Sequence, residues 1–371
     1  MLVDHSEAAA TARRSGRHAE LGLSDERLLG MYETMVLARA LDERQWILNR
    51  QGRQAFVISC QGHEAAQVGS AAALRPGLDV VATYYRDLAA ALAFGVSARD
   101  VMLEALSRAG APWTGGRQMP SHYGDPRLKV LSSSSAVATQ ITHAVGAALA
   151  SKIRGDGAAT ICYFGDGATS EGDFHEGLNF AAVHNLPVIF FCEDNGLAIS
   201  TSLDHQMPVR TVADRGAAYD MPGVSVDGGD LLAVYQATTE ARERALLGQG
   251  PTLIDAHVIR LTPHSSDDDD RRYRSSDELE RARRSDPLLR ARLYLEATGL
   301  LNGEQEQMLT SRVRATVDAA LEFALAAPLP DPSEAKWHVF KEELPSPPAP
   351  LPSLGEGPGV RAARGEDPCL R

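Results

Sequence analysis

The sequence predicts an α/β protein with a mostly parallel sheet flanked by helices. Two short apolar runs that end in small or acidic residues lie at 161–167 and 188–196, and the segment between them carries Phe174 and Leu178 on one helical face. A second strand–helix–strand unit follows at residues 223–260. Repeated units of this kind build one continuing parallel sheet. Hydrophobic residues make up 44% of the 371 residues, which is ordinary for a globular protein with a sizeable core.

The first third of the chain alternates between helical and strand patterns. Apolar side chains recur at helical spacing over residues 24–50, behind Ser24, which can cap a helix. Shorter patterns then indicate a strand or loop, a helix, and a strand that runs into another helix, at residues 56–60, 61–74 and 79–87.

The middle of the chain contains a loop and a helix of small residues. Residues 113–124 are rich in Gly and Pro and lack periodicity, so we expect a loop, and such loops commonly carry function. Residues 141–154 form a helical pattern that includes Gly146 and Ala150. Small side chains allow close packing, either in the core or against a twin subunit.

Further elements are expected toward the C-terminus. They are a helix, a strand, a helix, a strand and two helices, at residues 211–219, 223–226, 231–248, 252–260, 287–298 and 304–326. In the last helix, Leu309, Val313 and Val317 begin a stripe that is core or subunit interface.

Three regions of the chain differ in character. Residues 21–330 are expected to form one domain, preceded by a disordered N-terminus at 1–20. The C-terminal extension, 331–371, is rich in Pro and Gly and is predicted to be disordered from about residue 345.

Composition excludes several classes of partner. Lys and Arg total 37 against 49 Asp and Glu, so a nucleic acid or an anionic membrane is not favoured. The four cysteines are widely spaced, which favours neither a disulfide framework nor a zinc site and indicates a reduced, cytoplasmic location. No apolar run is long enough for a membrane span.

Asp166 and Asn195 each follow one strand of the first unit. Neighbouring parallel strands bring their C-terminal ends to the same edge of the sheet, where ligands of open α/β sheets bind. One carboxylate and one amide oxygen suit Mg²⁺ that is held jointly with the phosphates of a ligand. Gly165 and Gly167 let the backbone approach closely, and the helix that opens near Ser170 points N–H groups at an anion. The pattern predicts a Mg-diphosphate site, although an isolated Gly-Asp-Gly is more simply a turn.

Two further residues have both a functional and a structural interpretation. Arg86 follows a strand, where it can contact a phosphate through two N–H groups, or it is a surface arginine. The predicted diphosphate nearby favours the first interpretation. His264 begins a polar loop, residues 261–274, whose four consecutive acids indicate a solvated and mobile segment. A lone histidine is usually structural, but this position suits proton transfer.

The order of these motifs resembles a known family. Gly-Asp-Gly followed, one helix and one strand later, by Asn resembles the thiamin-diphosphate motif. Over residues 21–325 the sequence resembles the α subunit of the E1 component of 2-oxo-acid dehydrogenase complexes. Further segments match in the same order: Tyr-Arg at 85–86, Gly-Arg-Gln-Met-Pro at 116–120, Ala-Thr-Gln-Ile at 138–141 and Asn-Gly-Leu-Ala-Ile-Ser at 195–200.

The resemblance implies two cation sites. Mg²⁺ would be held by Asp166, Asn195 and the main-chain carbonyl of Leu197, a position that is more often Tyr in the family. A K⁺ site would lie near Ser134, Thr139 and Gln140. Residue 136 is Ala where the family usually has Pro, a departure that bears on this K⁺ site.

The resemblance also implies roles around the cofactor, thiamin diphosphate. The implied contacts are Tyr85, Arg86 and His264 to the diphosphate, Ser135 and Val137 to the aminopyrimidine, and Phe56, with Tyr85 and Ser135, to the substrate. His264 would also donate a proton when the acyl group passes to the lipoyl domain of the E2 partner.

Residues 264–274, His-Ser-Ser-Asp-Asp-Asp-Asp-Arg-Arg-Tyr-Arg, resemble those of the branched-chain enzymes. They imply a branched-chain 2-oxo acid as the small substrate, with pyruvate or acetoin as alternatives. No glutamate of this chain lies in a motif suited to activate the aminopyrimidine, and the family places that residue on an E1 β subunit. We therefore expect an α₂β₂ heterotetramer.

Two functions from other classes stay open. The chain could be a non-catalytic, thiamin-diphosphate-binding assembly subunit, which the presence of Arg86 and His264 disfavours. It could also be a Mg-dependent phosphohydrolase with Asp166 as nucleophile, which leaves the placement of Asn195 unexplained.

Overall fold

A computed structural model describes residues 16–336 of the chain. It divides at Pro330 into one unit that ends there and a second unit from Asp331 onward, in which Pro332–Lys336 form a 3₁₀ turn, η4. The disorder predicted from about residue 345, and residues 1–15 of the predicted disordered N-terminus, lie outside the described residues.

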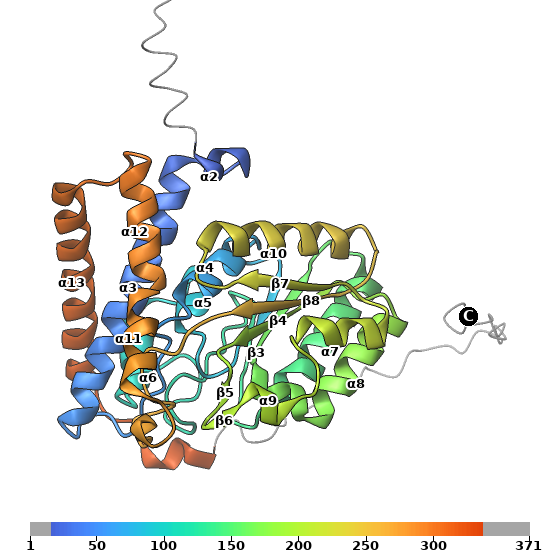
Figure 1. Cartoon of the computed structure of the whole chain (residues 1–371). Coiled ribbons are helices and arrows are strands. Elements are labelled where there is room, and N and C mark those ends of the chain that lie inside the picture. Colours follow the sequence, from blue (N-terminus) through green and yellow to red (C-terminus); the bar gives the residue numbers. More distant parts are fainter. Residues whose placement is uncertain (1–15, 337–371) are drawn as a thin grey trace, which may run out of the picture. The chain divides into compact units, whose positions relative to one another are not determined.

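A six-stranded sheet forms the centre of the first unit (Figure 1). Its order is β2-β1-β3-β4-β8-β7, and every pair of neighbouring strands is parallel. The strands are β1 (Val80–Ala82), β2 (Val130–Leu131), β3 (Thr160–Gly165), β4 (Val188–Asp194), β7 (Gly223–Asp227) and β8 (Thr252–His257). The predicted fold class is confirmed. A separate antiparallel pair joins β5 (Leu197–Ala198) to β6 (Thr201–Ser202).

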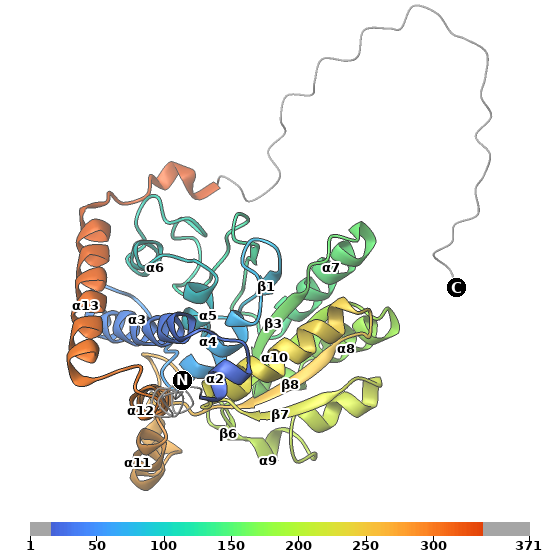
Figure 2. The same cartoon turned by 90° about the horizontal axis from the view of Figure 1, so that it is seen from above.

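Helices cover both faces of this sheet, because alternate residues of a strand point to opposite sides. Along β3, Ile161 and Tyr163 belong to one hydrophobic core, whereas Cys162 and Phe164 belong to the other. Figures 1 and 2 show α7 (Thr139–Arg154) and α8 (Gly172–Val183) on one face. The other face carries α3 (Asp25–Arg50), α4 (Glu64–Ala72), α5 (Leu88–Ala93) and α10 (Leu231–Leu246).

The remaining helices are shorter or lie at the C-terminal end of the unit. They are α2 (Arg17–Glu20), α6 (Ala98–Ala105), α9 (Leu203–Gln206), α11 (Ser276–Arg284), α12 (Pro287–Ala297) and α13 (Gly303–Ala326), with 3₁₀ helices η1 (Asp166–Ser170), η2 (Ala213–Tyr219) and η3 (Asp270–Arg272). The stripe of α13 belongs to the core: Leu309, Val313 and Val317 are buried in the same cluster as residues of α3 and α6. Among the described residues, no helix has the length and apolarity needed to cross a membrane.

The structure corrects several sequence expectations. Residues 17–20 are not disordered but form α2, because the ring of His18 is buried and hydrogen-bonds Tyr294 Oη (2.9 Å) and Asp25 Oδ1 (3.0 Å). The helix expected to open near Ser170 is α8, which begins at Gly172 after the separate 3₁₀ helix η1, and the helix expected at 211–219 is the 3₁₀ helix η2. The sequence patterns also missed α6 and α11, which are short helices.

Candidate active site

A cavity of about 470 Å³ lies at the C-terminal edge of the sheet. Its walls include all the residues that the sequence assigned to Mg²⁺, the cofactor and the substrate: Phe56, Tyr85, Arg86, Ser135, Val137, Gly165, Asp166, Gly167, Asn195, Leu197 and His264. Their convergence follows from the topology, since β1, β3, β4 and β8 are parallel and the residues that follow them emerge at one edge.

One wall of the cavity offers oxygen ligands to a cation. Asp166 is 1% exposed, and Gln206 Nε2 donates to its Oδ2 (2.7 Å). Burial, with the nearby charge of Asp194, raises the pKa of Asp166 to about 6 against the opposing hydrogen bond from Gln206. Asn195 Oδ1 is buried and has no hydrogen-bond partner in the described chain. A carboxylate destabilised by burial beside an unsatisfied amide oxygen fits a bound Mg²⁺.

Close backbone packing shapes this wall. A Cβ atom added at Gly167 would lie 2.9 Å from Ala198 Cβ, so any side chain there would collide with the segment that carries Leu197. The same addition at Gly165 would meet no atom closer than 3.9 Å, so the packing of the chain alone does not require that glycine.

The loop that carries Asn195 is held from the neighbouring strand. Asp194 Oδ1 accepts a hydrogen bond from Gly196 N (2.8 Å), and Asp194 Oδ2 lies 3.5 Å from His257 Nδ1 at the end of β8. The hydrogen bond with Asp194 raises the pKa of His257, so the pair strengthens as the imidazole gains a proton. Asn195 is thus oriented by residues that do not themselves line the cavity.

Arg86 gives the cavity a positive charge, and Arg260, which does not line the cavity, lies close enough to Arg86 for their charges to interact. Arg86 is 2% exposed, and its Nη1 donates to Ser59 O (2.5 Å) while its Nε has no partner. Arg260 is equally buried, with Nε and Nη1 unpartnered. Neither guanidinium forms an ion pair with a carboxylate among the described residues. A buried arginine in the cavity wall without a counter-charge, with a second unpaired arginine behind it, fits a ligand with anionic oxygens such as a diphosphate.

His264 lies beside these arginines. Its Nδ1 is 3.4 Å from Arg86 Nη2, and its ring meets Tyr85 edge to face with centroids 6.2 Å apart. Burial, and then the charges of Arg86 and Arg260, lower the pKa of His264 to about 4. The imidazole of the ligand-free chain is therefore neutral near pH 7.

The loop behind His264 is more ordered than its acids indicated. Asp268 Oδ2 accepts from His264 N (2.8 Å), and Asp270 is buried and lies 3.4 Å from Arg274 Nη1. The expectation of a solvated loop was wrong for Asp270, whose carboxylate is buried beside Arg274, and Asp268 is held by hydrogen bonds with His264 N and Tyr273 Oη.

A buried polar network supports the wall that holds Arg86. Glu193 Oε2 accepts from Tyr84 Oη (3.1 Å) and Gln67 Nε2 (3.1 Å), and it lies 2.6 Å from His63 Nδ1. These contacts tie the start of α4, the end of β1 and the end of β4 together. Local sequence patterns do not predict this network, because its members are far apart along the chain.

The predicted K⁺ ligands meet only in part. Ser134 Oγ is 3.3 Å from Thr139 Oγ1, and Thr139 Oγ1 donates to Ala136 O (3.0 Å). Gln140 instead donates from Nε2 to Tyr163 O (2.9 Å), which leaves its Oε1 as the atom free to face a cation.

The cavity also contains residues that sequence reasoning missed. They include Ile58, Tyr84, Met119, His122, Glu171 and Ile199. His122 lies in the loop at 113–124, which was expected to carry function without a particular residue being named. Its only signal was a lone histidine in a segment rich in Gly and Pro.

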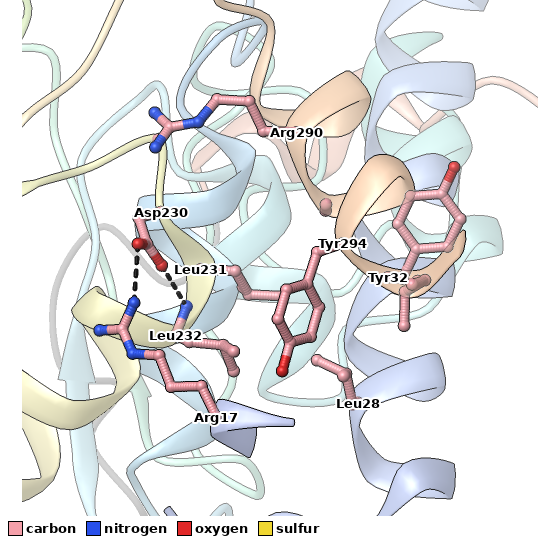
Figure 3. A pocket seen from close by; sticks show the side chains of 11 residues that line it. Arg17, Leu28, Tyr32, Asp230, Leu231, Leu232, Arg290 and Tyr294 are labelled. Carbon is pink, nitrogen blue, oxygen red and sulfur yellow. Dashed lines mark hydrogen bonds and ion pairs between the residues drawn. The ribbon is translucent and has the colours of Figure 1, made fainter. Parts of the chain in front are cut away.

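A second cavity, of about 200 Å³, lies between α3, α10 and α12 (Figure 3). Leu28, Leu231, Leu232 and Leu295 make it apolar, and the arginines at its mouth are neutralised: Arg17 by Asp230 (2.8 Å) and Arg290 by Asp227 (2.7 Å). Unlike the first cavity, it offers no unpaired charge to a ligand.

Comparison with known proteins agrees with this geometry. The sequence profile of the dehydrogenase E1 component family matches residues 32–333. The chain belongs to the dehydrogenase E1 component family. This E1 chain is 51% identical over 326 residues to the 2-oxoisovalerate dehydrogenase subunit alpha of Bacillus subtilis (strain 168), covering 88% of this chain and 99% of the relative.

Two other relatives of the E1 chain carry different names. It is 40% identical over 323 residues to the 3-methyl-2-oxobutanoate dehydrogenase subunit alpha of Mycobacterium tuberculosis (strain ATCC 25618 / H37Rv), covering 87% of this chain and 85% of the relative. It is 41% identical over 303 residues to the pyruvate dehydrogenase E1 component subunit alpha of Staphylococcus aureus (strain Mu50 / ATCC 700699), covering 81% of this chain and 79% of the relative. Membership of this family makes the E1 chain part of an oxidoreductase and implies thiamin diphosphate as its cofactor.

Proposed function

We propose that this chain is the α subunit of a branched-chain 2-oxo-acid dehydrogenase E1 component. In that role it takes part in the oxidative decarboxylation of a 2-oxo acid and the reductive acylation of a lipoyl group on E2. The observation that carries the proposal is the single cavity in which Asp166, Asn195 and Arg86 converge. Its two walls fit the two ends of a Mg-diphosphate.

The chain's own residues bind and orient the cofactor. Asp166, Asn195 and the main-chain carbonyl of Leu197 hold Mg²⁺, supported by the unpartnered Asn195 Oδ1. Tyr85, Arg86 and His264 bind the diphosphate, and Gly165 and Gly167 let the backbone approach it. When bound, thiamin diphosphate supplies the nucleophilic carbon and the electron sink that decarboxylation requires.

The other end of the cavity receives the aminopyrimidine and the substrate. Ser135 and Val137 contact the aminopyrimidine ring. K⁺ bound near Ser134, Thr139 and Gln140 stabilises the conformation of the segment that carries them. Phe56, together with Tyr85 and Ser135, faces the substrate. His264 would donate a proton to the sulfur that is released when the disulfide of the lipoyl group takes up the acyl group.

The lining of the cavity supports an aliphatic side chain on the substrate. Phe56, Ile58, Met119 and Val137 present apolar atoms to it, and burying a branched alkyl group against such a wall is favourable. The 51% identity to a 2-oxoisovalerate dehydrogenase subunit supports the same choice. The 41% identity to a pyruvate dehydrogenase subunit keeps pyruvate as the second candidate.

An α-type E1 chain implies a β-subunit partner and an E2 component. We infer that the working form is an α₂β₂ heterotetramer in which the β subunit supplies the carboxylate that activates the aminopyrimidine. The three described cysteines, Cys60, Cys162 and Cys192, are buried free thiols, which agrees with a reducing cytoplasm.

The substrate can be tested with the assembled enzyme. After co-expression with a candidate β subunit, we expect kcat/KM for 4-methyl-2-oxopentanoate to exceed that for pyruvate by at least about tenfold, since each extra buried methylene favours the larger substrate. The measured quantity is the rate of CO₂ release in the presence of an artificial electron acceptor, and the β subunit alone is the control. A preference for pyruvate would move the chain to the second candidate function.

A further inference from the structure

His122 occupies an unusual place in the loop between α6 and α7. Its side chain is 3% exposed although the neighbouring Met119 and Ser135 are exposed. The preceding residue, Ser121, has a φ of 72°, and Ala138 beyond Ser135 has a φ of 73°. Such left-handed conformations are costly without glycine and persist where the surrounding structure imposes them. They bracket the contact between His122 and Ser135.

The hydrogen bonds of His122 determine its tautomer. Nδ1 lies 2.8 Å from Met119 O and 3.2 Å from Pro120 O. Carbonyl oxygens only accept, so Nδ1 carries the proton. Nε2 of the neutral ring is then an acceptor, and it lies 2.7 Å from Ser135 Oγ.

The direction of the last hydrogen bond follows. Ser135 Oγ donates its only proton to His122 Nε2 and keeps its lone pairs for another donor. His122 and Ser135 both line the large cavity. The hydroxyl therefore faces that cavity as a hydrogen-bond acceptor and not as a donor.

We propose that His122 is a positioning residue that fixes the Ser135 hydroxyl as an acceptor for the exocyclic amino group of the cofactor's aminopyrimidine. The inference rests on the proposed function, because it needs thiamin diphosphate in this cavity. It goes beyond that function by adding a residue that does not itself touch the cofactor. The competing interpretation is that His122 only closes the loop through Met119 O.

The tautomer can be read directly. In ¹⁵N-histidine-labelled assembled enzyme, the ¹⁵N shifts of His122 should be those of a protonated Nδ1 and an unprotonated Nε2. Ser135→Ala should shift the Nε2 resonance by removing its donor. A protonated Nε2 in the neutral ring would overturn the proposal without any substitution at His122.

The positioning role is tested by a double-substitution cycle on the assembled enzyme. We expect His122→Ala and Ser135→Ala each to weaken thiamin diphosphate binding by up to about tenfold, the effect of losing one hydrogen bond. The double variant should bind no more weakly than either single variant, because the two residues act through one contact. Binding is measured by calorimetry at saturating Mg²⁺. In His122→Ala, KM for the 2-oxo acid should change less than the cofactor affinity, whereas Ser135→Ala can alter both because Ser135 also faces the substrate.

Two further variants separate positioning from folding. His122→Gln keeps a donor for Met119 O and an acceptor for Ser135 Oγ, so it should retain most of the affinity that His122→Ala loses. His184→Ala, an exposed histidine beyond the C-terminus of α8 at the opposite edge of the sheet, is the matched control. Additive effects in the cycle, or a His122→Ala loss that Ser135→Ala does not share, would overturn the proposal. Failure of the wild-type enzyme to bind thiamin diphosphate would instead overturn the proposed function.

Discussion

His264 and Arg86 lie side by side in the wall of the large cavity, and each affects what the other can do. Burial, and then the charges of Arg86 and Arg260, lower the pKa of the imidazole to about 4 in the ligand-free chain. A bound diphosphate would add negative charge beside Arg86 and offset that effect. The pKa of His264 should therefore be higher with the cofactor bound than without it, which suits a proton donor in acyl transfer.

Replacing this imidazole should separate cofactor binding from acyl transfer. We expect His264→Ala to leave thiamin diphosphate affinity within about tenfold of wild type, since Arg86 and the metal ligands remain. Acylation of the lipoyl domain should fall by about 10²–10⁴-fold, the usual range for losing a general acid. Single-turnover acylation of isolated lipoyl domain gives the rate, and an unchanged rate would exclude the role.

The same residue predicts a pH dependence of stability in the cofactor-free chain. Because its folded pKa of about 4 lies below the ordinary value of 6.5, the unfolded state binds more protons between these pH values. The stabilising effect of the neutral imidazole is present above pH 6.5 and is lost as the pH falls toward 4. The free energy of unfolding is measured with urea at a series of pH values. As the pH falls from 6.5 to 4, the free energy of unfolding of His264→Ala should rise relative to that of the wild type. A difference independent of pH would contradict the burial of a neutral histidine.

At the scale of elements, α7 and α8 pack closely because α8 has a glycine at the contact. A Cβ added at Gly177 would lie 2.6 Å from Ile141 Cγ2, a β-branched side chain that is fully buried. On α7, Gly146 is exposed, and a Cβ there would meet nothing within 4 Å. The two glycines therefore have different environments. Gly177 allows close packing in the core, whereas Gly146 lies on an exposed face of α7 with free space around it.

This contrast predicts opposite effects of the same substitution. Gly177→Ala should lower the free energy of unfolding by about 1–3 kcal/mol through overpacking, despite the higher helix propensity of Ala. Gly146→Ala should leave the free energy of unfolding unchanged or raise it by up to about 1 kcal/mol. Both values come from urea unfolding of the cofactor-free chain. Equal effects at the two positions would show that α7 and α8 adjust freely.

At the scale of the whole molecule, the proposed function requires a carboxylate that the large cavity does not supply from the described residues. Of the described residues that line it, Glu171 is the only glutamate, and it is an exposed residue at the start of α8. It lies next to η1, whose first residue is Asp166, on the metal side of the cavity. We do not expect it to act on the aminopyrimidine, whose predicted contacts are Ser135 and Val137.

Two measurements test this requirement for a partner. The purified chain should show no decarboxylation, and adding the β subunit should restore it. In the assembled enzyme, Glu171→Gln should keep the rate of C2 proton exchange of thiamin diphosphate within about tenfold of wild type, because the activating acid lies elsewhere. Turnover by the single chain, or loss of exchange in Glu171→Gln, would place the activating acid on this chain.

Much of the fold and the site could be predicted because the signals are local. The burial patterns of β3 and β4 follow from short apolar runs, and the start of α3 follows from Ser24, whose Oγ accepts from Arg27 N. Boundaries were less certain where two conformations compete. The division between η1 and α8 lies within a segment that contains Gly167 and Gly172, where helical spacing alone does not identify the break.

The sequence by itself determined the parallel sheet, the edge at which Asp166 and Asn195 meet, and membership of the E1 family, because each depends on periodicity or on motifs of a few residues. Only the tertiary structure decided that Gln206 hydrogen-bonds Asp166, that His63 and Tyr84 meet Glu193, and that His122 lies within hydrogen-bond distance of Ser135. These contacts join segments that become neighbours only after the strands and helices pack. Hydrogen bonds of this kind depend on the distance between two residues in the folded chain, so the sequence around either residue does not predict them.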